Sequence, residues 1–111
     1  MINWRRIDEL LNEFGAEDFA EVATLFLGEV DDGICQLDAL ISCPEALCEQ
    51  LHFLKGAALN LGFDALSDLC QRDEAMVMAD ATAPFQPDEI RRVFHESRKL
   101  FEKELPERLA A

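Results

Sequence analysis

The sequence predicts an all-α fold: an antiparallel four-helix bundle with a short extra helix at the N-terminus. Apolar residues recur at steps of three and four over several long stretches, and this spacing keeps one face of a helix turned toward a core. No stretch alternates between apolar and polar residues as a half-buried strand does. The connections between the predicted helices are short, which favours antiparallel neighbours.

Gly15 divides the N-terminal part of the chain into two predicted helices. Residues 3–12 form a short helix that Asn3 can cap, with Ile7, Leu10 and Leu11 on its buried side. A long helix is predicted over residues 16–41, because its apolar residues keep to one seam. The seam consists of Phe19, Ala23, Phe26, Val30, Gly33, Leu37 and Leu40. Gly33 lies on this seam, so we expect another helix to approach closely there.

Prolines and glycines mark the ends of the other three predicted helices. Pro44 and the acidic residue after it are typical of a first helical turn, and the helix that they open should continue until Gly62 ends or bends it. A further helix is predicted over residues 64–79. After a loop over residues 81–86, the last helix begins at Pro87.

The last two helices carry one unusual residue on a buried side. Asp73 lies among the inward residues Leu66, Leu69, Cys70 and Met76, so its carboxylate needs a partner or solvent. The inward residues of the last helix are Ile90, Val93, Phe94, Phe101 and Leu105. Pro106 should loosen that helix near its end.

The charge balance disfavours two classes of function. The chain has 111 residues, 23 of them acidic and 10 basic, which gives a net charge of −13 and disfavours binding to nucleic acid or to membrane surfaces. No apolar run reaches the length of a membrane span, and the N-terminus lacks a signal segment. We therefore expect a single cytoplasmic domain over residues 1–111 that buries its own core.

The predicted helix before Gly62 has a histidine on its outer face. Its apolar stripe falls within about 80° of the helical wheel and consists of Leu47, Leu51, Leu54, Ala58 and Leu61. His52 lies about 100° away from Leu51, together with Cys48, Lys55, Gly56 and Leu59. Glycine inside a helix costs roughly 1 kcal/mol relative to alanine. One reason to keep Gly56 is that it leaves the imidazole approachable.

The run His52-x-Leu54-Lys55-Gly56-Ala57-Ala58-x-x-Leu61-Gly62 resembles the signature of histidine-containing phosphotransfer (HPt) domains. Weaker similarity extends over residues 11–74, although Asp73 departs from the family, which usually has an apolar residue there. The resemblance implies a four-helix bundle whose exposed histidine carries a phosphoryl group between receiver domains of response regulators. It also implies that His52 is the phosphoacceptor, that Lys55 interacts with the phosphoryl group and that Gly56 gives access.

The resemblance further implies which molecules take part in the transfer. A neutral imidazole nitrogen can attack a phosphoryl group and form a phosphoramidate. The partners would be receiver domains and a sensor or hybrid histidine kinase, and the receiver would supply the Mg²⁺ and the aspartate. This chain has no Gly-rich phosphate loop, so we expect it neither to bind ATP nor to phosphorylate itself.

The surface around His52 is predicted to dock the receiver. Leu59 lies about 20° from His52 on the wheel, Phe63 could extend an apolar patch beyond Gly62, and Cys48 lies on the same face. The alternative is that Leu59 packs under a neighbouring helix. The four cysteines form no CxxC pair. A redox role of Cys48 is nevertheless open, beside incidental packing, because Cys48 lies one turn before His52.

Metal binding is disfavoured. Glu49-Gln50-Leu51-His52 is the half-site of a di-iron bundle, but the chain holds no second copy of it. The only other histidine, His95, is predicted to be solvated, and Lys99 stands where a zincin motif needs its second histidine. We expect no metal site in this chain.

The sequence supports three functional readings. The first is a stand-alone phosphorelay carrier, which His52, Lys55 and Gly56 favour. The second is an HPt-like module that docks to a receiver without carrying phosphate. The third is a piece of a larger hybrid or chemotaxis kinase. The N-terminal Met, and a chain that ends soon after its last predicted helix, favour the first reading over the third.

Overall fold

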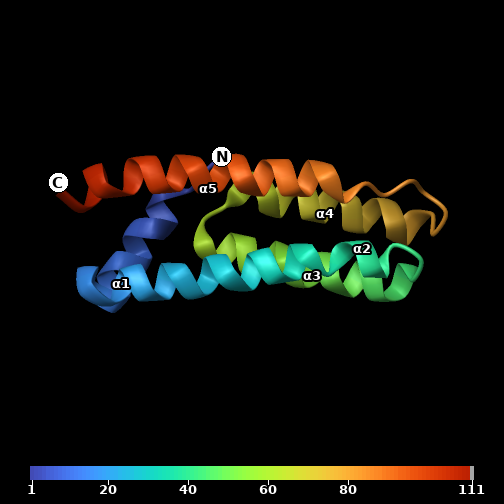
Figure 1. Cartoon of the computed structure of the whole chain (residues 1–111), viewed down its shortest axis with the longest axis horizontal. Coiled ribbons are helices and arrows are strands. Elements are labelled where there is room, and N and C mark those ends of the chain that lie inside the picture. Colours follow the sequence, from blue (N-terminus) through green and yellow to red (C-terminus); the bar gives the residue numbers. More distant parts are fainter. Residues whose placement is uncertain (111) are drawn as a thin grey trace.

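Four long helical segments lie side by side and alternate in direction (Figure 1). The computed structural model describes residues 1–110. Its helices are α1 (Trp4–Cys35), α2 (Leu37–Leu40), α3 (Pro44–Leu61), α4 (Asp64–Ala79) and α5 (Pro87–Ala110). No strand occurs among residues 1–110, and the bundle measures 48 × 19 × 19 Å. The predicted all-α antiparallel bundle is confirmed.

The short N-terminal helix is the first part of α1. Gly15 has non-helical dihedral angles (φ 80°, ψ 158°) and separates this part from the long helix that follows. The side chain of Asn3 accepts a hydrogen bond from the backbone N–H of Arg6 at 3.2 Å, as expected of a cap. The helix predicted over residues 16–41 is interrupted at Gln36, where ψ is −15° and the α-helical hydrogen-bond ladder breaks.

Helices α1 and α3 approach closely at Gly33. A Cβ atom at this position would lie 2.7 Å from Cδ2 of Leu54, so a larger residue does not fit without displacing a core leucine. The side-chain amide of Gln50 donates a hydrogen bond to the Gly33 carbonyl at 2.9 Å. The predicted close approach is confirmed, and it fixes α3, the helix that carries His52, against α1.

The turn between α3 and α4 is a Schellman motif, which ends a helix with a left-handed residue. Gly62 adopts φ 81°, and the next N–H, that of Phe63, donates to the Ala58 carbonyl at 2.8 Å. The residue after the glycine commonly packs back onto the core in this motif. Phe63 does so: it is fully buried, and its ring centroid lies 6.3 Å from that of Phe94 and 5.7 Å from that of Phe101.

Some predicted core positions are shifted by one residue. Phe26 and Met76 are only half-buried, and their neighbours Leu27 and Val77 are buried instead. Helix α5 continues through Pro106 to Ala110, so the predicted loosening is not seen. Within residues 1–110, no helix combines the length and the apolar character that crossing a membrane requires.

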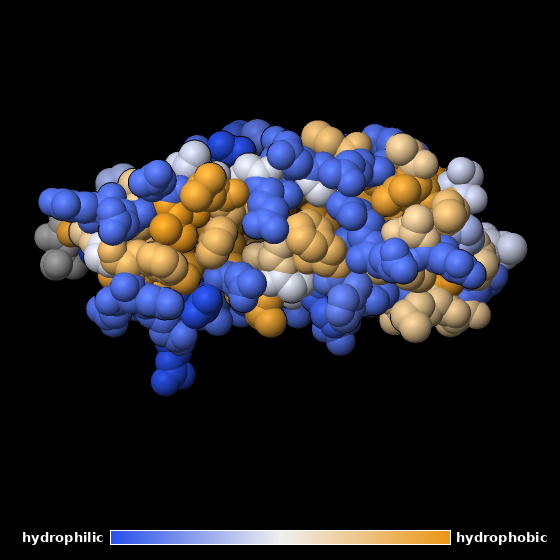
Figure 2. Space-filling view, turned by 90° about the horizontal axis from the view of Figure 1, so that it is seen from below, coloured by the Kyte–Doolittle hydropathy of each residue, from blue (hydrophilic) through white to orange (hydrophobic). Residues whose placement is uncertain are grey.

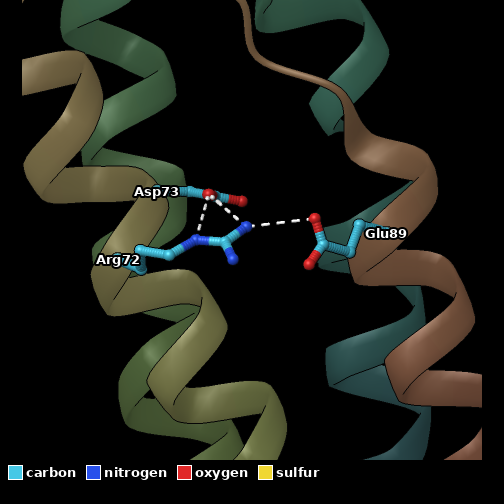
Figure 3. Close-up of polar contacts among 3 residues, drawn as sticks. All are labelled: Arg72, Asp73 and Glu89. Atoms are coloured by element: carbon cyan, nitrogen blue, oxygen red, sulfur yellow. Dashed lines mark hydrogen bonds and ion pairs between the residues drawn. The ribbon is translucent and has the colours of Figure 1, made fainter.

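Arg72 links a buried carboxylate on α4 to α5 (Figure 3). Asp73 is 4% exposed, and its Oδ1 accepts hydrogen bonds from Nε and Nη2 of Arg72 at 3.3 and 3.2 Å. The same Nη2 donates to Glu89 on α5 at 3.0 Å. Asp73 therefore has the partner that its position demands. Burial raises the pKa of Asp73 above the usual value, and although Arg72 opposes this effect, the net shift remains upward.

The raised pKa of Asp73 predicts a pH effect on stability. The folded state holds this proton more tightly than the unfolded state, so the ionised carboxylate destabilises the fold at neutral pH. That destabilisation should disappear as pH falls through the folded pKa toward the unfolded value near 3.9. Urea unfolding of the wild type and of Asp73→Asn at pH 7 and pH 4 isolates this carboxylate. The wild type should gain stability relative to the variant at pH 4; a relative loss would contradict the sign.

Candidate functional site around His52

Helix α3 separates a buried stripe from an exposed histidine. Its buried residues are the predicted ones: Leu47, Leu51, Leu54, Ala58 and Leu61. The His52 side chain, on the other side of the helix, is 67% exposed. The helix begins at Pro44 and ends at the left-handed Gly62, so both of its ends are set by the local sequence. The imidazole thus stands on a rigid helix and is open to a partner.

A carboxylate on α4 contacts the imidazole. Nδ1 of His52 lies 3.2 Å from Oε2 of Glu74, whose side chain is only 15% exposed. The other ring nitrogen, Nε2, does not face Glu74. A carboxylate beside one imidazole nitrogen favours the tautomer with its proton on that nitrogen, which makes the other nitrogen the nucleophile. The sequence pattern did not identify Glu74 as part of the site.

Lys55 and Gly56 follow His52 on the same face. Lys55 is half-buried, and its backbone carbonyl accepts a hydrogen bond from the Ser67 hydroxyl at 3.0 Å, which ties α3 to α4 beside the site. Gly56 is exposed, and a Cβ atom there would meet nothing within 4 Å. No contact among the described residues requires glycine at this position. The bare surface therefore fits the expectation that an outside molecule needs the space.

Two hollows flank the imidazole. One, of about 330 Å³, lies between α1 and α3 and is lined by Phe26, Glu29, His52, Phe53, Gly56, Ala57 and Asn60. The other, of about 370 Å³, lies between α3 and α4 and is lined by Cys48, Glu49, His52, Glu74 and Met78. Figure 2 looks onto the side on which α1 and α3 lie in Figure 1, and shows apolar areas separated by polar ones. His52 lines both hollows.

The three residues predicted to dock a receiver have different environments. Leu59 is 54% exposed, so the alternative that it packs under a neighbouring helix is wrong. Cys48 is half-buried and lines a hollow with His52. The prediction for Phe63 is wrong, because the turn after Gly62 directs this side chain into the core. Two exposed apolar residues that the sequence pattern did not single out, Phe53 and Met78, line the hollows instead.

The environment of Cys48 disfavours its reactive form. Partial burial raises the pKa of the thiol, and the negative charge of Glu74 raises it further. Thiolate is the nucleophilic and oxidisable form of cysteine, so these surroundings make Cys48 less reactive than an ordinary exposed thiol. Cys48 therefore contributes to this surface as a small apolar residue.

The second histidine lies elsewhere. His95 is exposed on α5, as predicted, and lines neither hollow beside His52. Among residues 1–110, no group of three or more histidine, cysteine, aspartate or glutamate side chains is placed to hold a metal ion.

Comparison with protein families identifies the family of this chain. The family model of the Hpt domain matches residues 21–111, which include His52, Glu74, the later part of α1 and the helices α3 and α4. No curated protein and no solved structure matched the chain. Residues 1–20 precede the matched region, but in the structure Ile7, Leu10 and Phe19 belong to the same core. The chain belongs to the Hpt domain family, the histidine-containing phosphotransfer modules that interact with response regulators and kinases in two-component signalling.

Proposed function

We propose that this protein is a phosphorelay carrier and that His52 accepts a phosphoryl group from the aspartate of one receiver domain and donates it to another. One observation carries the proposal: an exposed imidazole on a rigid helix has Nδ1 against the Glu74 carboxylate, next to a glycine that no internal contact requires. A histidine that served only to stabilise the fold would need neither an exposed ring nor a glycine beside it.

The proposed reaction uses Nε2 as the nucleophile. Glu74 holds the proton on Nδ1, so the lone pair of Nε2 is available for attack on the phosphorus of a phosphoaspartate. The N–P bond forms, the P–O bond to the aspartate breaks, and the aspartate leaves as a carboxylate. The ring gains positive charge in this step, and the nearby Glu74 carboxylate offsets it. The reverse reaction uses the same atoms.

Lys55 and the partner would supply the positive charge around the phosphoryl group. Phosphoryl transfer depends mostly on positioning and charge stabilisation. Lys55 lies three residues after His52 on the same helix, one turn away along the exposed face. The Mg²⁺ ion and the reacting aspartate would belong to the receiver. This chain then contributes the nucleophile, its orienting carboxylate, one cation and a docking surface.

Incubation with a phosphorylated receiver domain tests the proposal. The receiver carries radioactive phosphate, and the two proteins are separated after the reaction. We expect label on this protein that is lost in acid and retained in base, as a phosphoramidate requires. A protein that binds the phosphorylated receiver but acquires no label would instead be a docking module, the second reading that the sequence left open.

Gly56→Gln should slow the transfer. The longer side chain fills the open space beside the imidazole and obstructs the receiver, whereas loss of a helical glycine should stabilise the fold by about 1 kcal/mol or less. Stopped-flow or quenched labelling gives the transfer rate, and urea unfolding gives the stability. Unchanged transfer in the folded variant would show that the glycine does not serve access.

A further inference from the structure

A single residue joins the first part of α1 to the rest of this helix. We call residues 4–14 the N-terminal helix; they precede residues 21–111, which the family model matches. Within residues 4–35, Gly15 alone has non-helical dihedral angles, and its combination of φ 80° and ψ 158° is open almost only to glycine. If Gly15 took helical angles, these 32 residues would form one continuous helix of about 48 Å.

The N-terminal helix is held by backbone groups at the α3–α4 turn. The N–H of Asn3 donates to the Gly62 carbonyl at 2.6 Å, and Nε of Arg6 donates to the Asn60 carbonyl at 3.0 Å. In Figure 1 the N-terminal helix crosses one end of the bundle, from α5 to the start of the long part of α1. Gly15 is exposed at the bend, and a Cβ atom there would meet nothing within 4 Å, so side-chain packing does not fix this joint.

The N-terminal helix also supplies side chains to the core. Ile7 and Leu10 are 0% and 2% exposed and belong to the hydrophobic core of the bundle. The ring of Trp4 stacks on that of Phe101, with centroids 6.1 Å apart, and the guanidinium carbon of Arg108 lies 4.4 Å from the Trp4 centroid. Detached from its site, this helix would expose apolar side chains to water, so it needs an equivalent site elsewhere. A second copy of the chain offers a site of the same shape and chemistry.

We propose that two copies of this protein exchange their N-terminal helices and so form a dimer. In the dimer, residue 15 is helical, and each N-terminal helix continues α1 away from its own bundle. It then occupies the site on the α3–α4 turn and α5 of the other copy. This inference does not depend on the phosphorelay function.

The exchange keeps the contacts of the monomer. Each bundle still receives one N-terminal helix, with the same hydrogen bonds to the carbonyls of Asn60 and Gly62 and the same buried side chains. Exchange of an identical element is therefore a low-cost route to a dimer. Bringing two copies together costs entropy, and this cost falls as the protein concentration rises. Monomer and dimer should accordingly exist in a concentration-dependent equilibrium.

The exchange site is remote from the reactive histidine. The N-terminal helix contacts the Gly62 end of α3, and His52 precedes Gly62 by ten residues, or about 15 Å along the helix. The exchanged helix therefore leaves the imidazole free in both bundles.

Two matched substitutions test the joint. Gly15→Ala places an L-residue in a conformation that glycine alone adopts readily, so it penalises the monomer and favours the form in which residue 15 is helical. Gly28→Ala is the control. Gly28 is also exposed on α1, and a Cβ atom there would also meet nothing within 4 Å, but its backbone is already helical.

Sedimentation of both variants and of the wild type is measured over a concentration series. High salt screens the repulsion between copies that each carry a net charge of −13. A reducing agent prevents disulfides through the exposed thiols of Cys35 and Cys43. Circular dichroism checks that each variant is folded.

The expected dissociation constants differ between the two alanine variants. Gly15→Ala should lower the dimer dissociation constant about tenfold or more, because the exchange relieves one strained residue in each copy. Gly28→Ala should stay near the wild type, since this substitution changes monomer and dimer alike. A folded Gly15→Ala protein that remains monomeric at every concentration would overturn the proposal.

The single tryptophan identifies the exchange itself. A sample of ¹³C-labelled and unlabelled protein, unfolded and refolded together, gives isotope-filtered NOEs between atoms of different copies. In the Gly15→Ala dimer we expect such an NOE between the rings of Trp4 and Phe101. A dimer that lacks this NOE is held by another surface, which contradicts the exchange. The wild type at millimolar concentration should show the same NOE. A wild type that sediments as a monomer throughout would refute the exchange, whether or not Gly15→Ala folds.

Discussion

We expect His52→Gln to abolish phosphoryl uptake from a phosphorylated receiver, and His95→Gln to leave it near the wild-type level. This is the largest effect that we expect, because the reaction needs an imidazole nitrogen and an amide is not a comparable nucleophile. The chain has only these two histidines. Both are exposed on helices, but within residues 1–110 only His52 has an acidic partner on its ring and a bare glycine beside it.

The pair of variants is well matched for this measurement. Glutamine has a similar size, and position 52 is exposed, so the bundle should remain folded. The assay follows radioactive phosphate from the receiver to each variant, with circular dichroism as the folding control. Label that persists on His52→Gln, or that disappears in His95→Gln, would contradict the assignment of His52 as the phosphoacceptor.

Gly62→Ala should destabilise the fold by at least about 2 kcal/mol. The left-handed backbone alone costs an L-residue roughly 1–2 kcal/mol. In addition, a Cβ at Gly62 would lie 2.9 Å from the backbone oxygen of Asn3. Asn3 cannot easily move away, because its backbone N–H donates to the Gly62 carbonyl at 2.6 Å. The substitution therefore strains both the α3–α4 turn and the docking of the N-terminal helix.

Gly56→Ala is the control for that prediction. It makes the same chemical change in a right-handed helix with open space around the new methyl group, so it should stabilise the fold by up to about 1 kcal/mol. Urea unfolding of the two variants should give shifts of opposite sign. A Gly62→Ala protein as stable as the wild type would show that the turn tolerates a side chain, contrary to its left-handed geometry and its close contact with Asn3.

The sequence predicted well the features that depend on one helix at a time. The stripe of α3 and the exposure of His52 both follow from a period of 3.6 residues. The start of α3 follows from Pro44 and its end from Gly62, because proline favours a first helical turn and glycine favours the residue after a helix. Gly33 was also identified correctly, because glycine on a buried seam has few explanations other than close approach.

Features that depend on two elements were harder to predict. Glu74 reaches His52 only because α3 and α4 form a hairpin around Gly62, with His52 ten residues before the turn and Glu74 twelve after it. Counting similar numbers of residues before and after Gly62 would have indicated that Glu74 lies opposite His52. Phe63 was misplaced for a similar reason: the wheel of α3 does not apply beyond the turn, and the Schellman geometry directs this side chain inward.

The position of the phosphoryl group on the ring tests the proposed mechanism most directly. Nitrogen and phosphorus NMR of the protein, labelled with ¹⁵N-histidine and phosphorylated by its receiver, identifies the residue and the nitrogen. The mechanism predicts a phosphoramidate on Nε2 of His52, with Nδ1 still protonated toward Glu74. A phosphoryl group on Nδ1, or on any other residue, would contradict it.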